Sequence, residues 1–366
     1  MRTSNLAREA GLSAGVPNSV PAHTVTMACI SANQAAANVG SMINSGQIEV
    51  AIAGGAETMS DVPIRFSREM RKRLLKMQKF KGPQDLLKFF KGFKLGYLAP
   101  EAPAIAEYST GEVMGHSSDR LAAKWGVTRE EQDDFAFRSH TLAAKAHKEG
   151  LLKDEIVAVN GNTLDNGIRG DATREKLASL KPAFVKPHGT HTAANSSFLT
   201  DGASAALFSS ETWAKQHGFV PKARMTDWMF VAQDPKEELL LGPAYAVTRL
   251  MAKHGLTVKD VDVFELHEAF AGQVLANLRA LDSDTFVQKN VGLSGVAKLG
   301  EIPSEKLNAW GGSLSIGHPF GATGTRIITT AANRLIKENG RFAILAAHAA
   351  GGQAVAMLME RYTPSA

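Results

Sequence analysis

The sequence has one cysteine, Cys29, in 366 residues. A disulfide within the chain is therefore impossible, and so is a zinc site built on several thiolates, which makes a reducing compartment the simplest expectation. Long apolar runs are missing too. Even residues 342–359 are interrupted by His348 and Gln353, whereas a membrane-spanning helix needs about 18 to 20 unbroken apolar residues. The sequence thus excludes a disulfide scaffold and a spanning protein.

Acidic residues are scarce in one segment of the chain. Between Arg65 and Lys94 there are eleven basic residues and two acidic ones, a net charge of +9, while the whole chain carries +5 and the remainder therefore −4. A nucleic-acid protein coated in basic residues would not confine them to one segment, so no nucleic-acid partner is expected. The segment predicts a local anionic surface or ligand instead.

With 44% hydrophobic and 21% charged residues, the chain has the composition of a globular protein with room for two core-forming units. Strand and helix patterns alternate in its first sixty residues and again in its second half. We predict strands at 24–28, 50–53, 203–208 and 261–266, a further element at 223–231, an apolar hairpin at 342–347 and 354–360, and helices at 31–45, 129–149, 243–253, 268–281 and 325–338.

The order of these elements predicts an α/β fold with two similar β/α halves. Residues 1–60 together with 190–210 are expected to form the N-terminal half, which looks truncated at its start. Residues 61–189 are expected to form an inserted loop domain with a basic membrane-contact segment, and residues 211–366 the C-terminal half.

Cys29 lies between a predicted strand and the helix that Ser31 begins. The positive end of a helix dipole favours a thiolate, so we expect the pKa of Cys29 to lie below the free value of about 8.5. A lowered pKa would make this thiol a nucleophile. The alternative for an isolated cysteine beside a strand is a buried, inert hydrophobic residue.

Three histidines occupy junctions between strands and loops. His318 lies in a Gly-His-Pro-Phe-Gly segment, in which the proline fixes the backbone and the glycines allow close approach to the imidazole. His267 opens a predicted helix directly after a strand, and His348 interrupts the apolar hairpin ahead of two glycines. Each alone could be a structural histidine. Together with Cys29 they favour a Cys/His acyl-transfer site.

Four segments resemble the active-site loops of thiolases and occur in the family's order. They are Met27-Ala28-Cys29-Ile30-Ser31-Ala32-Asn33, His267-Glu268-Ala269-Phe270, Gly317-His318-Pro319 and Ala349-Ala350-Gly351-Gly352-Gln353. The resemblance extends from Asn5 to Tyr362. It is greatest to the β subunits of mitochondrial trifunctional complexes, the 3-ketoacyl-CoA thiolases of fatty-acid β-oxidation, because of His267, the segment at 195–202 and the basic insertion.

The resemblance implies the thiolase fold, an α-β-α-β-α layered arrangement with an inserted loop domain, and thiolytic cleavage of medium- or long-chain 3-ketoacyl-CoA. Cys29 would attack the keto carbon, and His318 would take its proton. His267 with a water, together with His318, would hold the thioester oxygen that becomes the enolate. The backbone N–H groups of Cys29 and Ala350 would hold the other oxygen. Ser197 matches the family's CoA-contacting serine.

The resemblance also implies partners and a location. It predicts a homodimer core that assembles with a hydratase/dehydrogenase α subunit, peripheral on the matrix side of the mitochondrial inner membrane. Its ligands are the substrates acyl-CoA and CoA, and no metal or redox cofactor is implied.

His348 stands where thiolases carry a second cysteine, which protonates the leaving enolate and activates the incoming thiol. An imidazole with a reference pKa of about 6.5 exchanges protons at neutral pH. We therefore expect His348 to take over this role and the rate to fall as pH drops through its pKa. One alternative is a catalytically impaired, thiolase-like scaffold subunit of a β-oxidation complex. Another is a thiolase that forms acetoacetyl-CoA with the same residues.

The basic segment also has an amphipathic pattern, in which apolar residues interleave with lysines. The apolar residues are Leu86, Leu87, Phe89, Phe90 and Phe93. Aromatic rings beside lysines are typical of a helix lying in a lipid interface, so the pattern predicts contact between residues 65–94 and an anionic membrane surface. A solvated charged face and binding of CoA phosphates are the alternatives.

Overall fold

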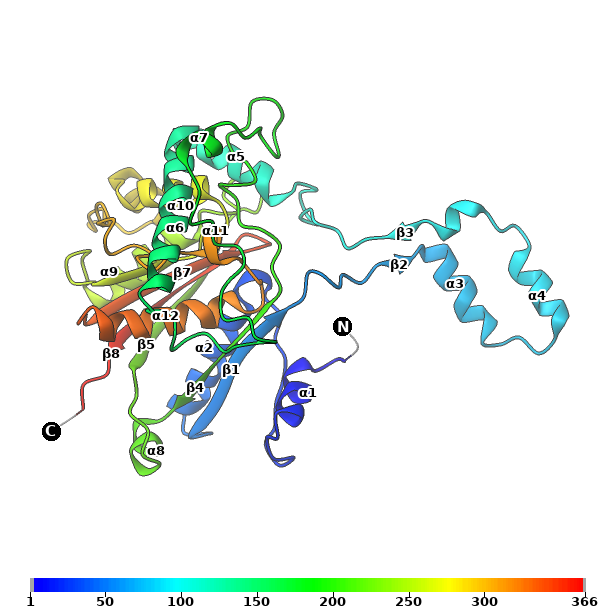
Figure 1. Cartoon of the computed structure of the whole chain (residues 1–366), viewed down its shortest axis with the longest axis horizontal. Helices are drawn as coiled ribbons and strands as arrows, with labels where there is room; N and C mark the ends of the chain where they lie inside the picture. Colours follow the sequence, from blue (N-terminus) through cyan, green and yellow to red (C-terminus); the bar gives the residue numbers. More distant parts are fainter. Residues whose placement is uncertain (1–2, 365–366) are drawn as a thin grey trace.

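Two β-sheets with helices between them organise the protein, which this computed structural model describes from residue 3 to residue 364 (Figure 1). The larger sheet has the strand order β5-β8-β7-β6. Its strands are β5 (Ala223–Ala232), β6 (Val263–Leu266), β7 (Phe342–Ala349) and β8 (Gln353–Arg361). Strand β6 runs parallel to β7, whereas β8 is antiparallel to both of its neighbours.

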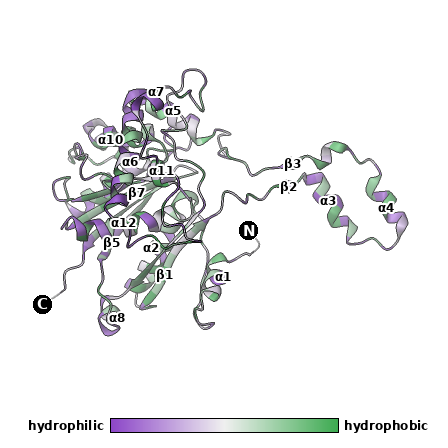
Figure 2. Ribbon diagram, in the orientation of Figure 1, coloured by the Kyte–Doolittle hydropathy of each residue, from purple (hydrophilic) through white to green (hydrophobic). Residues whose placement is uncertain are grey.

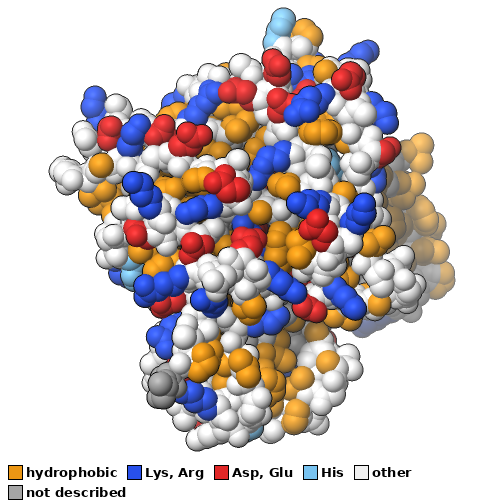
Figure 3. All heavy atoms as spheres, turned by 60° about the vertical axis from the view of Figure 1, so that its left-hand side comes forward, with side chains coloured by type: hydrophobic (Ala, Val, Ile, Leu, Met, Phe, Trp, Pro, Cys, Tyr) orange, Lys and Arg blue, Asp and Glu red, His pale blue; other side chains and the backbone are white. Residues whose placement is uncertain are grey.

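The smaller sheet pairs β1 (Val50–Glu57) with β4 (Gly202–Ser209) in antiparallel register. Side chains of β1 alternate between its faces: Ala53 is buried, whereas Ile52 is 63% exposed opposite Leu207, which is 48% exposed. In Figure 3, hydrophobic side chains are accordingly visible on the lower part of the molecule, where β1, β4 and α8 (Glu211–Gln216) lie. One face of this sheet is buried and the other is open.

Helices α2 (Ser31–Asn44) and α12 (Thr323–Lys337) lie between the two sheets, because α12 contacts strands of both and also packs on α2. Their crossing is close: a Cβ on Gly324 would lie 2.4 Å from Oδ1 of Asn33. Only glycine allows this approach. Helix α9 (Gly242–His254) covers the opposite face of the larger sheet, and α10 (Ala271–Leu281) packs on α9.

Strand β7 is apolar on both faces because a helical layer covers each of them. Ile344 and Ala346 belong to the hydrophobic cluster on the α9 side, whereas Leu345 and Ala347 belong to the cluster that contains Cys29. Figure 2 shows the same concentration of hydrophobic residues in the strands. The C-terminal end of this buried strand carries His348.

Most of the insertion packs back onto the body of the protein. Helices α5 (Met114–Lys124), α6 (Arg129–Lys148) and α7 (Arg174–Ala178) form this part, with α6 against both α10 and α11 (Ser313–Ile316). A capping box starts α6, because the Thr128 side chain accepts from the Glu131 N–H and the Glu131 side chain accepts from the Thr128 N–H.

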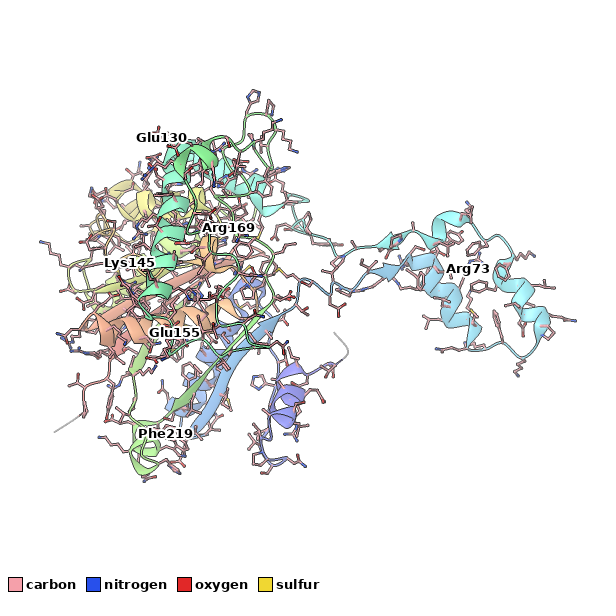
Figure 4. All side chains as sticks on the ribbon, in the orientation of Figure 1. Arg73, Glu130, Lys145, Glu155, Arg169 and Phe219 are labelled. Atoms are coloured by element: carbon pink, nitrogen blue, oxygen red, sulfur yellow. The ribbon has the colours of Figure 1, made fainter. Side chains whose placement is uncertain are left out.

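The basic segment projects from the body as a helical hairpin (Figure 1). It consists of β2 (Arg65–Phe66), α3 (Arg68–Met77), α4 (Pro83–Phe90), the 3₁₀ turn η2 (Leu95–Leu98) and β3 (Pro100–Glu101), which pairs with β2. Arg73 lies inside the hairpin (Figure 4). Its guanidinium donates to the carbonyls of Phe89, Lys91 and Gly92 and lies over the Tyr97 ring, 5.3 Å from the centroid.

Three of the predicted elements differ from the structure. Residues 24–28 are not a strand, because no strand of the described chain pairs with them; they lead into the 3₁₀ turn η1 (Ala28–Ile30). The helix predicted from residue 268 begins at Ala271, because Phe270 forms a β-bridge with Ser196. Strand β1 runs past residue 53 to Glu57. The remaining elements are α1 (Leu6–Ser13) and the π-helical turn η3 (Phe286–Val291).

Of the helices within residues 3–364, none combines the length and the apolar character needed to cross a membrane.

Candidate active site

A tight, strained turn presents Cys29 at the start of α2. Ala28 has a φ of 46°, a left-handed conformation that is unusual for a residue other than glycine. The Ser31 hydroxyl closes the turn: it accepts from the Met27 N–H at 2.8 Å and donates to the Ala28 carbonyl at 2.6 Å. The 3₁₀ turn packs against β7 and α12. Cys29 is therefore held at the point where both halves of the chain meet.

The thiol of Cys29 is 4% exposed, and burial raises its pKa to about 12. The N–H groups of Ala350 and of Cys29 itself face the sulfur and lower the pKa, but by less than burial raises it. The expectation that the helix terminus would lower the pKa of Cys29 below its free value is therefore wrong. Desolvation of a charged sulfur outweighs the dipole. The thiol is neutral at pH 7, so its proton must leave during attack.

The turn between β7 and β8 supplies the N–H of Ala350. Its conformation is fixed from outside, because the Gly351 N–H donates to a carboxylate oxygen of Glu107 at 3.0 Å. The structure thus brings together the two backbone donors, Cys29 and Ala350, that were predicted to hold one substrate oxygen. They face the same sulfur.

The three predicted histidines converge on one buried space from three different elements. The ring centroids of His267 and His318 are 3.9 Å apart, and those of His267 and His348 are 5.4 Å apart. Each side chain is at most 2% exposed. Burial, followed by the repulsion between neighbouring imidazoles, lowers the pKa of His267 and of His318 well below the usual value. Both are therefore neutral at pH 7.

The loop before α12 fixes both the position and the tautomer of His318. Gly317 has a φ of 105°, and a Cβ there would lie 2.6 Å from Oγ1 of Thr200, which accepts from the His318 N–H at 3.0 Å. The hydroxyl of Thr323 donates to the Pro319 carbonyl at 3.1 Å, so it accepts from Nδ1 of His318 at 2.7 Å. The hydrogen of His318 is therefore on Nδ1. Its Nε2 is buried, unpartnered and free to accept a proton.

His348 differs from the other two histidines in that neither ring nitrogen has a hydrogen-bond partner. Burial alone lowers its pKa to about 3. The expectation that His348 titrates at neutral pH is therefore wrong, since an unpartnered imidazole in an apolar layer gains nothing that offsets the desolvation of its charged form. It is neutral throughout the physiological range.

Ser197 lies on the segment that borders the His267 loop. Its N–H donates to the Ala269 carbonyl at 2.8 Å, and the Ala271 N–H donates to the Asn195 carbonyl at 3.0 Å. Ser197 is half-buried. The predicted CoA contact is thus placed beside the histidine cluster rather than within it, and its role stays a prediction.

Three residues that position the site were not predicted from the sequence: Thr200, Thr323 and Glu107. The role of Thr323 could have been found from the local sequence, because Thr323 is a small polar residue one helical turn after Pro319, whose carbonyl accepts its hydrogen bond. Thr200 and Glu107 act across long sequence separations, which local patterns do not reveal. Within residues 3–364, no group of three or more potential ligands is arranged to hold a metal ion.

Comparison with known proteins agrees with this geometry. A family model described as "Thiolase, N-terminal domain" matches residues 1–212, and one described as "Thiolase, C-terminal domain" matches residues 219–361. The chain belongs to the thiolase family. The predicted family and the predicted thiolase fold are thereby confirmed, and members of this family with 3-ketoacyl-CoA thiolase activity are acyltransferases.

Relatives of this thiolase carry consistent names. The mitochondrial trifunctional enzyme subunit beta of Bos taurus is 56% identical over 99% of this chain and 76% of that protein. A probable 3-ketoacyl-CoA thiolase of Caenorhabditis elegans is 58% identical over 99% of this chain and 81% of that protein. Among solved structures, human mitochondrial 3-ketoacyl-CoA thiolase in complex with CoA superposes with a TM-score of 0.79 at 29% identity, covering 98% of this chain and 82% of that one.

Proposed function

We propose that this thiolase cleaves medium- or long-chain 3-ketoacyl-CoA with CoA, yielding acetyl-CoA and an acyl-CoA shortened by two carbons. The observations that carry the proposal are the Cys29 thiol, which faces two backbone N–H groups, and the cluster of three buried histidines. The names of the relatives, subunit beta of the trifunctional enzyme and 3-ketoacyl-CoA thiolase, support the same substrate class.

In the first half-reaction, the Cys29 sulfur bonds to the 3-keto carbon, and the keto oxygen takes the negative charge. The N–H groups of Cys29 and Ala350 would stabilise this oxygen, because they already face the sulfur. Collapse then breaks the bond between C2 and C3. The acyl group stays on Cys29, and acetyl-CoA leaves as its enolate.

His318 is the base that this step requires. Its Nδ1 hydrogen is given to Thr323, so the Nε2 lone pair can accept the proton of Cys29 as the sulfur attacks. The thioester oxygen that becomes the enolate would lie against His267 and His318. Ser197 would contact the CoA that carries it.

The second half-reaction transfers the acyl group from Cys29 to a fresh CoA thiol. Over the whole cycle, the proton of Cys29 ends on C2 of acetyl-CoA, and the proton of the CoA thiol ends on Cys29. We propose that His348 carries these protons in place of the family's second cysteine. Its pKa of about 3 opposes the role, because so weak a base takes a proton from a thiol only when negative charge develops beside it.

This observation favours a second candidate function, an impaired thiolase that acts as a scaffold subunit of a β-oxidation complex. The two candidates share the fold and the nucleophile but differ in turnover. Condensation to acetoacetyl-CoA is the reverse of the same chemistry and would use the same residues.

The helical hairpin is proposed to contact an anionic membrane, although with a different face from the one that the sequence suggests. Phe89 is buried and Phe93 half-buried, and both rings pack inside the hairpin. The side chains that remain for a lipid interface include Leu87, 73% exposed, and Phe90, 57% exposed. They stand among lysines on a projecting arm, which suits insertion below phosphate headgroups (Figure 1).

We further propose a mitochondrial location, peripheral on the matrix side of the inner membrane, and a homodimer core that assembles with a hydratase/dehydrogenase subunit. The support is the printed name of the relatives, a beta subunit of a mitochondrial trifunctional enzyme. The proposed membrane contact of the hairpin would agree with this location.

The proposed activity is tested by a thiolysis assay on the purified chain with 3-ketoacyl-CoAs of graded length. CoA-dependent formation of acetyl-CoA, fastest for medium or long chains, is the expected result. If correctly folded protein forms no acetyl-CoA from a substrate of any acyl-chain length, the scaffold function is the better description.

A further inference from the structure

A chain of hydrogen bonds leads from the half-buried Arg326 to the buried His267. Nη2 of Arg326, on α12, donates to Oγ of Ser313 at 3.1 Å. The same oxygen lies 2.9 Å from Nδ1 of His267. Ser313 is fully buried, and His267 is 1% exposed.

Counting donors and acceptors fixes the direction of these hydrogen bonds. A guanidinium has only donors, so Ser313 must accept from Arg326. The hydroxyl hydrogen of Ser313 then needs an acceptor, and within residues 3–364 the available one is Nδ1 of His267. Ser313 therefore donates to Nδ1. The hydrogen of the neutral imidazole is consequently on Nε2, which is buried without a partner.

We infer that Ser313 and Arg326 are positioning residues, which hold His267 in the Nε2–H tautomer so that it donates to the enolate oxygen of the departing acetyl-CoA. The inference rests on the proposed thiolase function for its chemistry. It deepens that function by naming the residues that make His267 a donor while the neighbouring His318 is an acceptor.

The arrangement suits a donor that must not reorganise during the reaction. An imidazole in the other tautomer would present a lone pair to an oxyanion and repel it. Nη1 of Arg326 is buried without a hydrogen bond among the described residues. The guanidinium polarises the Ser313 hydroxyl, and its positive charge also disfavours a second proton on His267.

The test compares Ser313→Ala with Ser315→Ala, a matched control on the same short helix. Ser315 is equally buried, and its hydroxyl bonds to Ser139 and to the Gly312 carbonyl rather than to a histidine. We expect Ser313→Ala to lower kcat for thiolysis by about 10- to 100-fold with KM changed less than about threefold, because the donor acts on the enolate. Ser315→Ala should stay within about threefold of wild type.

A second readout does not depend on turnover. In protein labelled with ¹⁵N-histidine, NMR should show His267 protonated on Nε2 and His318 protonated on Nδ1, with His267→Asn used to assign the signals. Ser313→Ala should shift His267 toward the Nδ1 tautomer, and Ser315→Ala should not.

A wild-type His267 that carries its hydrogen on Nδ1, or equal kinetic effects of the two alanine variants, would overturn the inference. If the wild type proves inactive, the proposed function fails, but the NMR comparison still tests whether Ser313 sets the tautomer.

Discussion

The imidazole rings of His267 and His318 lie 3.9 Å apart and are tilted by 41° to each other. In each ring Nδ1 is bonded to a hydroxyl: Ser313 bonds Nδ1 of His267, and Thr323 bonds Nδ1 of His318. Both Nε2 atoms are left buried without partners. The consequence is that one ring can donate to a substrate oxygen while the other accepts a proton.

Thr323 should matter to catalysis through His318. Thr323→Val removes the acceptor for Nδ1 at nearly constant volume, so His318 loses its preferred tautomer and kcat should fall by on the order of 10²-fold. Thr323→Ser keeps the hydroxyl and should retain most of the activity. Steady-state thiolysis by the two variants checks this, and equal activity would contradict the assignment of His318 as the base.

His348 is tested by comparing His348→Cys with His348→Ala. If His348 carries protons, the alanine variant should lose at least about 10²-fold in rate, and the cysteine variant should retain or raise the rate. A different pattern, with wild type and alanine equally inactive and cysteine active, would show that the second half-reaction is defective in the natural protein. The thiolysis assay with each variant distinguishes these outcomes.

Stability should fall in acid because of His348. Its pKa is about 3 when folded and about 6.5 when unfolded, so between these values the unfolded chain binds more protons. Stability is therefore fully present above pH 6.5 and is lost as pH falls toward 3. From pH 6.5 to pH 5 the loss from this residue is about 2 kcal/mol.

Urea unfolding at the two pH values measures the effect in wild type and in His348→Cys. His267 and His318 are present in both proteins, so the part of their contributions that comes from burial cancels. The variant should lose about 2 kcal/mol less than wild type on acidification. Parallel losses in both proteins would show that His348 is not buried in a neutral form.

Membrane binding should depend on the exposed face of the hairpin. Leu86→Ser, Leu87→Ser and Phe90→Ser together should weaken binding to vesicles that contain phosphatidylglycerol by at least about tenfold. Binding should also weaken with salt, since the Debye length is about 10 Å at 0.1 M. Phe219→Ser with Val220→Ser is the control, because these exposed residues lie far from the hairpin (Figure 4).

Vesicle co-sedimentation measures this binding. Equal binding to neutral vesicles would contradict the electrostatic part of the proposal, and equal effects of the two sets of substitutions would contradict the role of the hairpin.

Much of the site could be predicted because its residues lie in short ordered motifs. Cys29, His318 and Ala350 come from separate loops, and their convergence follows from the family's order of motifs rather than from local propensity. The helix at 129–149 was predicted nearly to its ends, because helical periodicity is a local property of the sequence. The hairpin of β7 and β8 was also predicted, because its two apolar runs are visible in the local sequence.

The charge state of the site could not be predicted. The position of Cys29 at a helix start is visible in the sequence, but the depth of its burial is not, and desolvation is the larger effect on its pKa. His348 was misjudged for the same reason.

The direction in which the Phe89 and Phe93 side chains point could not be predicted either, because it depends on a residue distant in the sequence. An apolar side chain suits a lipid interface and a protein interior equally well. Arg73, on the neighbouring helix, decides between them by bonding the Phe89 carbonyl and packing on the Phe93 ring.

The most direct test of the account is acylation of Cys29. Purified protein is incubated with a 3-ketoacyl-CoA without free CoA, and peptides are analysed by mass spectrometry while acetyl-CoA release is followed. We predict the acyl group, shortened by two carbons, on the Cys29 peptide, about one acetyl-CoA released per site, and a loss of several orders of magnitude in turnover for Cys29→Ala. Unchanged turnover in Cys29→Ala, or an adduct on another residue, would contradict it.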